Sequence, residues 1–145
     1  MRPAHAYVPG ETPRHPEGAF DAIRESVTPG LAPEALAGTQ AWRTGLCWLN
    51  EGYYWEAHEV LEPVWMAAPP NAPERHLVRA VIQCANARLK RRMGRENAAR
   101  RLEALVAGLL DECALSGRSR VMELDLAAAR AALLGGARFD IESAI

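Results

Sequence analysis

Apolar side chains recur every three or four residues along most of the chain, which is the period of an amphipathic α-helix. Six segments show this period: residues 17–27, 33–50, 53–66, 74–93, 96–114 and 125–134. In the two longest segments, Leu, Val and Ala form most of the apolar stripe, and Arg and Glu occupy the other faces. No segment shows the alternation of apolar and polar residues that is typical of a β-strand. The pattern therefore predicts an all-α fold.

The first seventeen residues differ from the rest of the chain. Four prolines within residues 1–17 exclude a regular helix, because each proline removes a backbone N–H donor. This segment is predicted to form an extended, Pro-rich N-terminal arm. The arm is either anchored to the domain through Tyr7 and Val8 or loosely ordered.

The chain is predicted to fold as one domain, because 145 residues is an ordinary domain length. Short loops between the main helices favour antiparallel neighbours, so we expect a single-domain antiparallel bundle of about five helices. We distinguish an N-terminal arm and short helix at residues 1–32, a helical core domain at residues 33–135 and a tail at residues 136–145. The tail is expected to lie extended along the surface.

Two residues predict local features of the helices. Pro63 lies inside segment 53–66 and predicts a kink or an early end of that helix, since it cannot donate a backbone hydrogen bond. Asp125 is predicted to cap the last helix by accepting a hydrogen bond from a free backbone N–H.

Composition and charge narrow the classes of function. The net charge of −1 does not favour nucleic acid as a partner, and the basic residues 88–92 suit the solvated end of a helix. No apolar run reaches the length of a membrane span, so we expect no membrane partner. Cys47, Cys84 and Cys113 are odd in number and form no CxxC motif. They are therefore predicted to be free, buried thiols in a cytoplasmic protein.

The segment YYWEAHEVLEPVW, which begins at Tyr53, holds the densest mixture of ionisable and aromatic residues. On a helix, His58 and Glu62 are four residues apart and thus lie on one face, at the edge of the apolar stripe and beside Tyr54. Glu62 and His58 are the candidate metal ligands, because a His and a Glu one turn apart can bind a divalent cation.

The other two acids of this segment relate differently to His58. Glu59 lies further round the helix and is a second carboxylate or base for a metal-assisted reaction, so His58 and Glu59 are the candidate catalytic residues. Glu56 points nearly away from His58, and both Glu56 and Glu59 also fit a solvated helix surface. A structural alternative applies to His58 itself, which can fix helix packing through one hydrogen bond.

Segment 74–93 adds two amides, Gln83 and Asn86, at the border of its apolar stripe. Partly buried amides need hydrogen-bond partners, and an antiparallel packing against segment 53–66 would let His58 and Glu62 supply them. The sequence therefore predicts a polar seam between two helices, which consists of His58, Glu59, Glu62, Gln83 and Asn86.

Three functions are compatible with this seam. The first is a binding or interaction module whose ligand-binding residues are Tyr54, His58, Glu62, Gln83 and Asn86. The second is a metal-assisted or acid–base enzyme, hydrolytic in type, that uses His58 with Glu59 or Glu62. The third is a homodimer that buries a face rich in the four tryptophans. No cofactor is expected, and a divalent metal belongs only to the enzyme alternative.

The stretch LNEGYYWEAHEVLEPVW, from Leu49 to Trp65, resembles the signature of a family of small prokaryotic proteins known as domain of unknown function 309. Family members carry a phrase of the form FNxGxYxEAHExLExxW and then a helix of the form GLIQxAxAxxH. Ile82, Gln83 and Ala85 correspond to the second phrase. The resemblance implies an all-helical fold and a site at these helices, and it implies no reaction.

The second phrase also shows where this chain departs from the family pattern. Lys90 stands where many members have a His, and Ala80 stands where they have a Gly. Pro63 is likewise unlike the usual residue at its position. If the family His binds a metal or a substrate, Lys90 does not supply the same ligand here.

Overall fold

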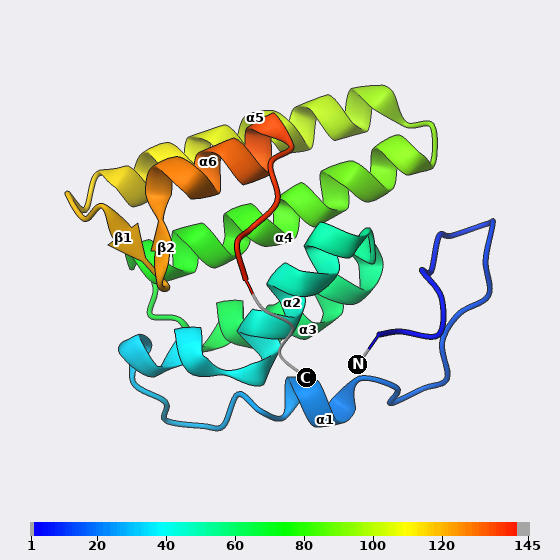
Figure 1. Ribbon diagram of the computed structural model, residues 1–145, viewed down its shortest axis with the longest axis horizontal. Helices are drawn as coiled ribbons and strands as arrows, with labels where there is room; N and C mark the ends of the chain where they lie inside the picture. Colours follow the sequence, from blue (N-terminus) through cyan, green and yellow to red (C-terminus); the bar gives the residue numbers. More distant parts are fainter. Residues whose placement is uncertain (1, 142–145) are drawn as a thin grey trace.

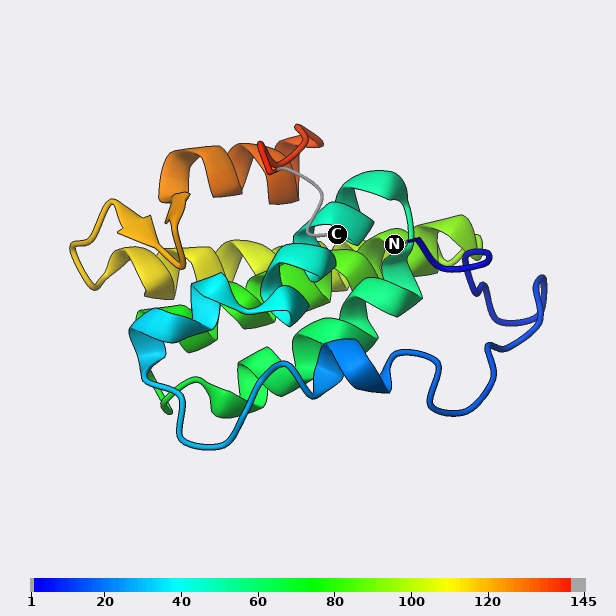
Figure 2. The ribbon, with the colours of Figure 1, turned by 60° about the horizontal axis from the view of Figure 1, so that its bottom comes forward.

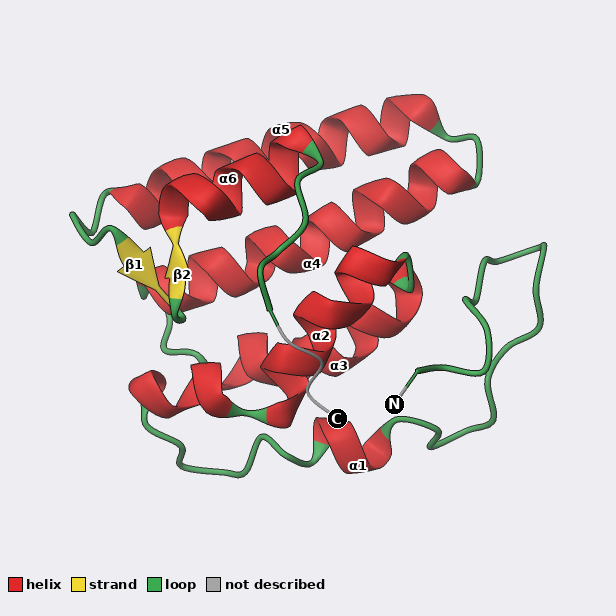
Figure 3. Cartoon of the chain, viewed as in Figure 1, coloured by secondary structure: helices red, strands yellow, loops and turns green. Residues whose placement is uncertain are grey.

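The computed structural model describes residues 2–141 (Figures 1 and 3). Its elements in chain order are α1 (Asp21–Arg24), the 3-10 helix η1 (Pro33–Gly38), α2 (Gln40–Glu51), α3 (Tyr54–Ala67), α4 (Pro73–Arg92), α5 (Glu96–Ala114), β1 (Arg120–Val121), β2 (Leu124–Asp125) and α6 (Leu126–Gly135). Helices make up nearly all of the regular structure, so the predicted all-α fold is confirmed. The two strands form one short antiparallel hairpin.

The main helices pack as two pairs. The long helices α4 and α5 lie side by side in opposite directions, and α2 and α3 form a second pair that packs on α4 through α3 (Figure 1). Helix α6 lies on α5 and α4, and Figure 2 shows α6 and α1 on opposite sides of the bundle. No helix within residues 2–141 is both long and apolar enough to cross a lipid bilayer.

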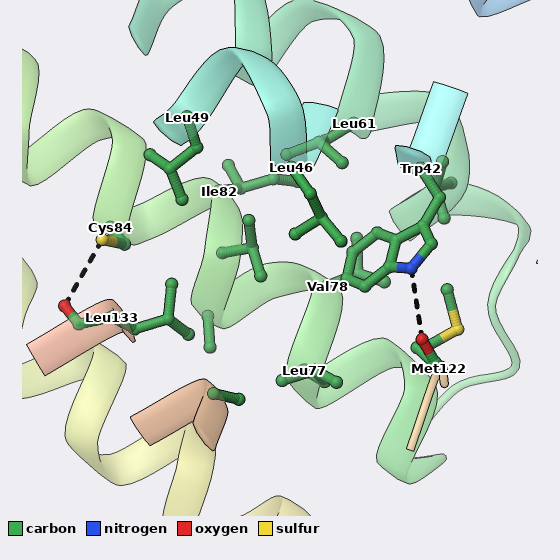
Figure 4. Close-up of a cluster of buried hydrophobic side chains, with 14 of the residues drawn as sticks. Trp42, Leu46, Leu49, Leu61, Leu77, Val78, Ile82, Cys84, Met122 and Leu133 are labelled. Carbon is green, nitrogen blue, oxygen red and sulfur yellow. Dashed lines mark hydrogen bonds between the residues drawn. The ribbon is translucent and has the colours of Figure 1, made fainter. Parts of the chain in front are cut away.

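The core lies where α2, α3 and α4 meet (Figure 4). Trp42 and Leu46 from α2, Leu61 from α3 and Val78 from α4 are each at most 1% exposed. The indole N–H of Trp42 donates to the carbonyl of Met122 over 3.2 Å, which joins this core to the hairpin. Burial of such side chains is the main favourable contribution to folding.

Two predicted helices are shorter than expected. Within residues 17–27, only the single turn of α1 is helical, and Gly18 precedes it with a left-handed φ of 77°. Residues 33–50 divide at Thr39, where the extended backbone ends η1. The Thr39 hydroxyl then accepts a hydrogen bond from the Trp42 backbone N–H over 3.2 Å, so α2 begins there with its own cap.

The hairpin before α6 was not predicted. Its turn residues, Met122 and Glu123, have φ values of 53° and 61°, a conformation that Asn and Gly adopt far more readily. The sequence therefore carries no turn signal at this point, and strands of two residues are too short to show a period. Asp125 accepts a hydrogen bond from the Ala128 backbone N–H over 3.1 Å, which confirms the predicted cap of the last helix.

Pro63 lies within α3 and does not end it, because the helix continues to Ala67. The predicted early end is therefore wrong. Proline cannot donate to the carbonyl four residues earlier, which belongs to Glu59. The Arg24 guanidinium donates to this carbonyl instead, so a side chain of α1 replaces the missing backbone donor.

Both described ends of the chain bind the C-terminal end of α2. Arg2 Nε lies 3.1 Å from the carboxylate of Glu51. The Asn50 side chain donates to the Phe139 carbonyl over 2.9 Å and accepts from the Phe139 N–H over 2.8 Å. Because Phe139 is buried, the tail docks against the core up to residue 141 instead of lying only along the surface. Its predicted course over residues 142–145 lies outside the described residues.

Two of the three cysteines are buried free thiols as predicted, Cys84 in α4 and Cys113 in α5, whereas Cys47 in α2 is half-buried and not fully buried as expected. Burial raises the pKa of each thiol to about 11, because the thiolate would lose its hydration. We expect both thiols to resist iodoacetamide at pH 8 in the folded protein and to react after unfolding in guanidinium chloride. Peptide mass spectrometry measures the labelling, and rapid labelling of Cys84 in the folded protein would contradict the expectation.

Candidate functional site

A pocket of about 230 Å³ lies between α3 and α4 and contains most of the predicted polar seam. We call it the α3–α4 pocket. The residues that line it are His58, Glu62, Trp65, Arg79, Ile82, Gln83 and Asn86. The structure thus brings together every residue of the predicted seam except Glu59.

Helical spacing explains how two helices line one pocket. The lining residues of α3 follow one another at intervals of four and three, and those of α4 fall within two turns of one face. A short loop joins the helices and they run in roughly opposite directions (Figure 1). His58 and Asn86 therefore lie toward one end of the pocket, and Trp65 and Arg79 lie toward the other.

His58 and Glu62 lie close together without a hydrogen bond. Their nearest atoms, Nε2 and Oε2, are 3.6 Å apart, which exceeds the usual length of such a bond. The Glu62 carboxylate also lies 3.6 Å from a guanidinium nitrogen of Arg24. The side chains of His58 and Glu62 are 31% and 40% exposed, so a solute can reach both.

The two amides of the seam bind each other. Asn86 Nδ2 donates to Gln83 Oε1 over 3.1 Å, and both side chains are partly buried as predicted. The expectation that His58 and Glu62 would partner the amides is wrong, because the side-chain hydrogen bond that the amides form within residues 2–141 joins them to each other, one helical turn apart on α4. The amide nitrogen of Gln83 and the amide oxygen of Asn86 have no partner within residues 2–141.

Two further candidates lie outside the pocket. Tyr54 packs under the guanidinium of Arg92, whose central carbon is 4.4 Å from the ring centroid. Glu59 lies 3.8 Å from Arg24 and lines a separate hollow of about 320 Å³ beside α1 and the N-terminal arm. Neither residue is placed to act together with Gln83 or Asn86.

Glu56 is the residue that the sequence reasoning misplaced. Its side chain is fully buried, whereas a solvated surface was one expectation for it. Its carboxylate accepts a hydrogen bond from the Tyr7 backbone N–H over 2.7 Å and lies 2.6 Å from His15 Nε2. The N-terminal arm thus folds over α3, with Val8 also buried, so the anchored alternative for the arm is the one observed.

Aromatic rings enclose this contact between the arm and α3. The ring of His15 stacks on that of His5, with centroids 4.4 Å apart, and meets the edge of Phe20. Tyr7 lies against Trp55 at right angles, with centroids 5.2 Å apart. No sequence period links residues so far apart in the chain. The prolines of the arm predict an extended backbone, and they do not indicate which residues of α3 the arm contacts.

The tryptophans do not form an exposed face. Trp42 and Trp48 are each 1% exposed and belong to the core. Trp65 packs beneath Arg75, whose guanidinium carbon is 4.6 Å from its ring. The tryptophan-rich partner surface expected for a homodimer is therefore not present in that form, and the oligomeric state stays a prediction.

The arrangement has limited capacity for metal chemistry. Within the described part of the chain, no three side chains of His, Cys, Asp or Glu gather closely enough to hold a metal ion. His58 with Glu62 would supply two ligands, whereas catalytic zinc sites use three. The pocket has more to offer to a polar molecule, because it combines unused hydrogen-bond groups with the apolar side chains of Trp65 and Ile82.

Comparison with protein families matches residues 42–102 to a family described as a domain of unknown function, DUF309. The match spans α2, α3, α4 and the start of α5, and it includes every residue that lines the α3–α4 pocket. It confirms the resemblance read from the signature. No curated protein matches the chain. No solved structure matches it either.

Proposed function

We propose that this protein binds a small polar molecule in the α3–α4 pocket. The observation that carries the proposal is that one hollow of about 230 Å³ gathers a histidine, a carboxylate and two amides against an apolar wall. Ligand sites in proteins characteristically combine a few placed polar groups with apolar lining. The family description assigns no activity, so the proposal stands on the pocket itself.

Unused hydrogen-bond capacity supports binding over a purely structural seam. Buried polar groups are normally satisfied within the protein, whereas partly exposed ones keep donors and acceptors that a solute can use. Here His58 and Glu62 stand 3.6 Å apart without a hydrogen bond, and the amide pair uses one of its donors and one of its acceptors. A bound molecule would supply the hydrogen-bond partners that these side chains lack.

The volume limits the size of the ligand. Pockets for drug-sized ligands measure roughly 300–1,000 Å³, and the α3–α4 pocket is smaller than that. The pocket therefore suits a small metabolite better than a cofactor of nucleotide size.

The alternative is an acid–base or metal-assisted hydrolase that uses His58 with Glu62. Its geometric support is the 3.6 Å separation of their side chains. Glu59 belongs to a different hollow and is not placed to assist. Metal that copurifies with the protein and is lost from a folded His58→Ala variant, measured by elemental mass spectrometry, would favour the enzyme.

The binding proposal is tested with mixtures of small polar amides, amines and carboxylates. We expect them to shift the Gln83 and Asn86 side-chain signals in ¹H–¹⁵N spectra of the protein. Asn86→Ala should weaken binding by roughly tenfold, the effect of about one hydrogen bond. Glu59→Gln, on α3 and outside the pocket lining, is the control and should leave binding unchanged. Shifts that map elsewhere, or that persist fully in folded Asn86→Ala, would contradict the proposal.

A further inference from the structure

We propose that the ligand of the α3–α4 pocket is a small organic monocarboxylate whose carboxylate binds Arg79. This inference rests on the proposed function and adds the chemical class of the ligand. It follows from the charges that line the pocket, from the balance of donors and acceptors, and from the nature of its wall.

The two charged residues that line the pocket, Glu62 and Arg79, differ in their ion-pair partners. Glu62 is the acidic residue of the lining, and its carboxylate has Arg24 and His58 beside it, each at 3.6 Å. Arg79 is the basic residue of the lining, its side chain is exposed, and it has no ion-pair or hydrogen-bond partner within residues 2–141. The pocket therefore presents one guanidinium without a counter-ion, which calls for one negative charge from the ligand.

Hydrogen-bond donors also exceed acceptors near Arg79. The guanidinium carries five N–H donors and the free amide nitrogen of Gln83 carries two more, while Asn86 retains one donor and its amide oxygen. An ionised carboxylate is an acceptor-only group and can bind a guanidinium through two parallel hydrogen bonds. Among small anions, a carboxylate matches the planar guanidinium of Arg79 best.

The rest of the ligand is organic and short. Trp65 shares one end of the pocket with Arg79, and Ile82 lies beside Gln83, so a carboxylate at that end has apolar surface around its carbon chain. Inorganic phosphate fits less well, because it offers no apolar surface and its charge of about −1.5 to −2 exceeds that of one guanidinium.

The test uses linear and branched monocarboxylates of three to six carbons, the neutral amides with the same carbon skeletons, and inorganic phosphate. Each is titrated into the full chain while ¹H–¹⁵N spectra follow the side-chain amides of Gln83 and Asn86. We expect at least one carboxylate to bind about tenfold or more tightly than its matched amide. Binding should weaken with added salt, since one partner is an exposed charge.

Variants assign the charge to its residue. Arg79→Gln should weaken carboxylate binding by roughly 10- to 100-fold and leave the matched amide unaffected. Arg101→Gln is the matched control, because Arg101 is an exposed arginine on α5 outside the pocket lining. Circular dichroism confirms that both variants fold.

The outcomes separate the two proposals. If the amides bind as tightly as the carboxylates, if phosphate alone binds, or if Arg79→Gln changes nothing, the carboxylate inference is wrong and binding in the pocket still stands. If neither these probes nor the mixtures of polar molecules shift the Gln83 and Asn86 signals, the proposed function fails together with the inference.

Discussion

Gly45→Ala is expected to lower the free energy of unfolding by about 2–3 kcal/mol, the usual cost of overpacking a core. Gly45 lies on α2 directly against α3, and a Cβ atom built there would overlap Cγ and Cδ2 of Leu61 and lie 3.0 Å from its Cδ1. Leu61 is fully buried, so it can make room for the new methyl group only by displacing the core side chains around it. Urea unfolding followed by circular dichroism measures the change.

Gly108→Ala is the control for the intrinsic effect of the substitution. Gly108 lies inside α5, is exposed, and has nothing within 4 Å of a built Cβ. Alanine is the better helix former by about 1 kcal/mol, so this variant should be slightly more stable than the parent protein. If Gly45→Ala matched Gly108→Ala in stability, the close packing of α2 on α3 would be disproved.

Glu56→Ala is expected to release the N-terminal arm and to lower the free energy of unfolding by about 2–4 kcal/mol, because two buried groups lose their hydrogen-bond partner. The substitution removes the acceptor of the Tyr7 N–H and the partner of His15, whose side chain is only 5% exposed. Hydrogen exchange at the Tyr7 amide should become fast, because that amide loses its acceptor. Urea unfolding measures the loss of stability.

Glu51→Ala provides the matched comparison, because Glu51 also holds the arm, through Arg2. That pair is exposed on the arginine side, with 72% of the Arg2 side chain accessible. Exposed pairs contribute about 0–1 kcal/mol, so Glu51→Ala should leave both stability and the Tyr7 amide nearly unchanged. Equal effects of the two substitutions would show that Glu56 does not anchor the arm.

Local patterns were sufficient to predict the helices that form the pocket. The apolar stripes of α4 and α5 end at recognisable positions, and Gly94 between them has the left-handed φ of 80° that glycine allows. Helical spacing also predicted that His58 and Glu62 share a face with the amides opposite them. These features depend on residues within a few turns of each other, which is the range that a sequence period reports.

Contacts between distant residues were not predictable in the same way. Glu56 meets residues 41 and 49 positions earlier in the chain, and no helical period relates such partners. An acidic helix residue without a partner on its own helix is assigned to the solvated surface. The irregular segment that covers Glu56 shows no period from which this contact could have been predicted. Arg24, likewise, holds Glu59 and Glu62 from a single-turn helix that sequence patterns overestimated in length.

Helix α3 depends on a tertiary contact for one of its hydrogen bonds, because the Arg24 side chain replaces a missing backbone donor. An α-helix usually closes its own ladder of hydrogen bonds, so its stability as an isolated peptide depends only on its own residues. In α3, the Glu59 carbonyl finds its donor on a guanidinium 35 residues earlier in the chain. A peptide of residues 54–67 would leave that carbonyl to water. The helix that carries His58 and Glu62 therefore reaches its full set of backbone partners only when α1 is docked, which ties the order of one pocket wall to the N-terminal segment.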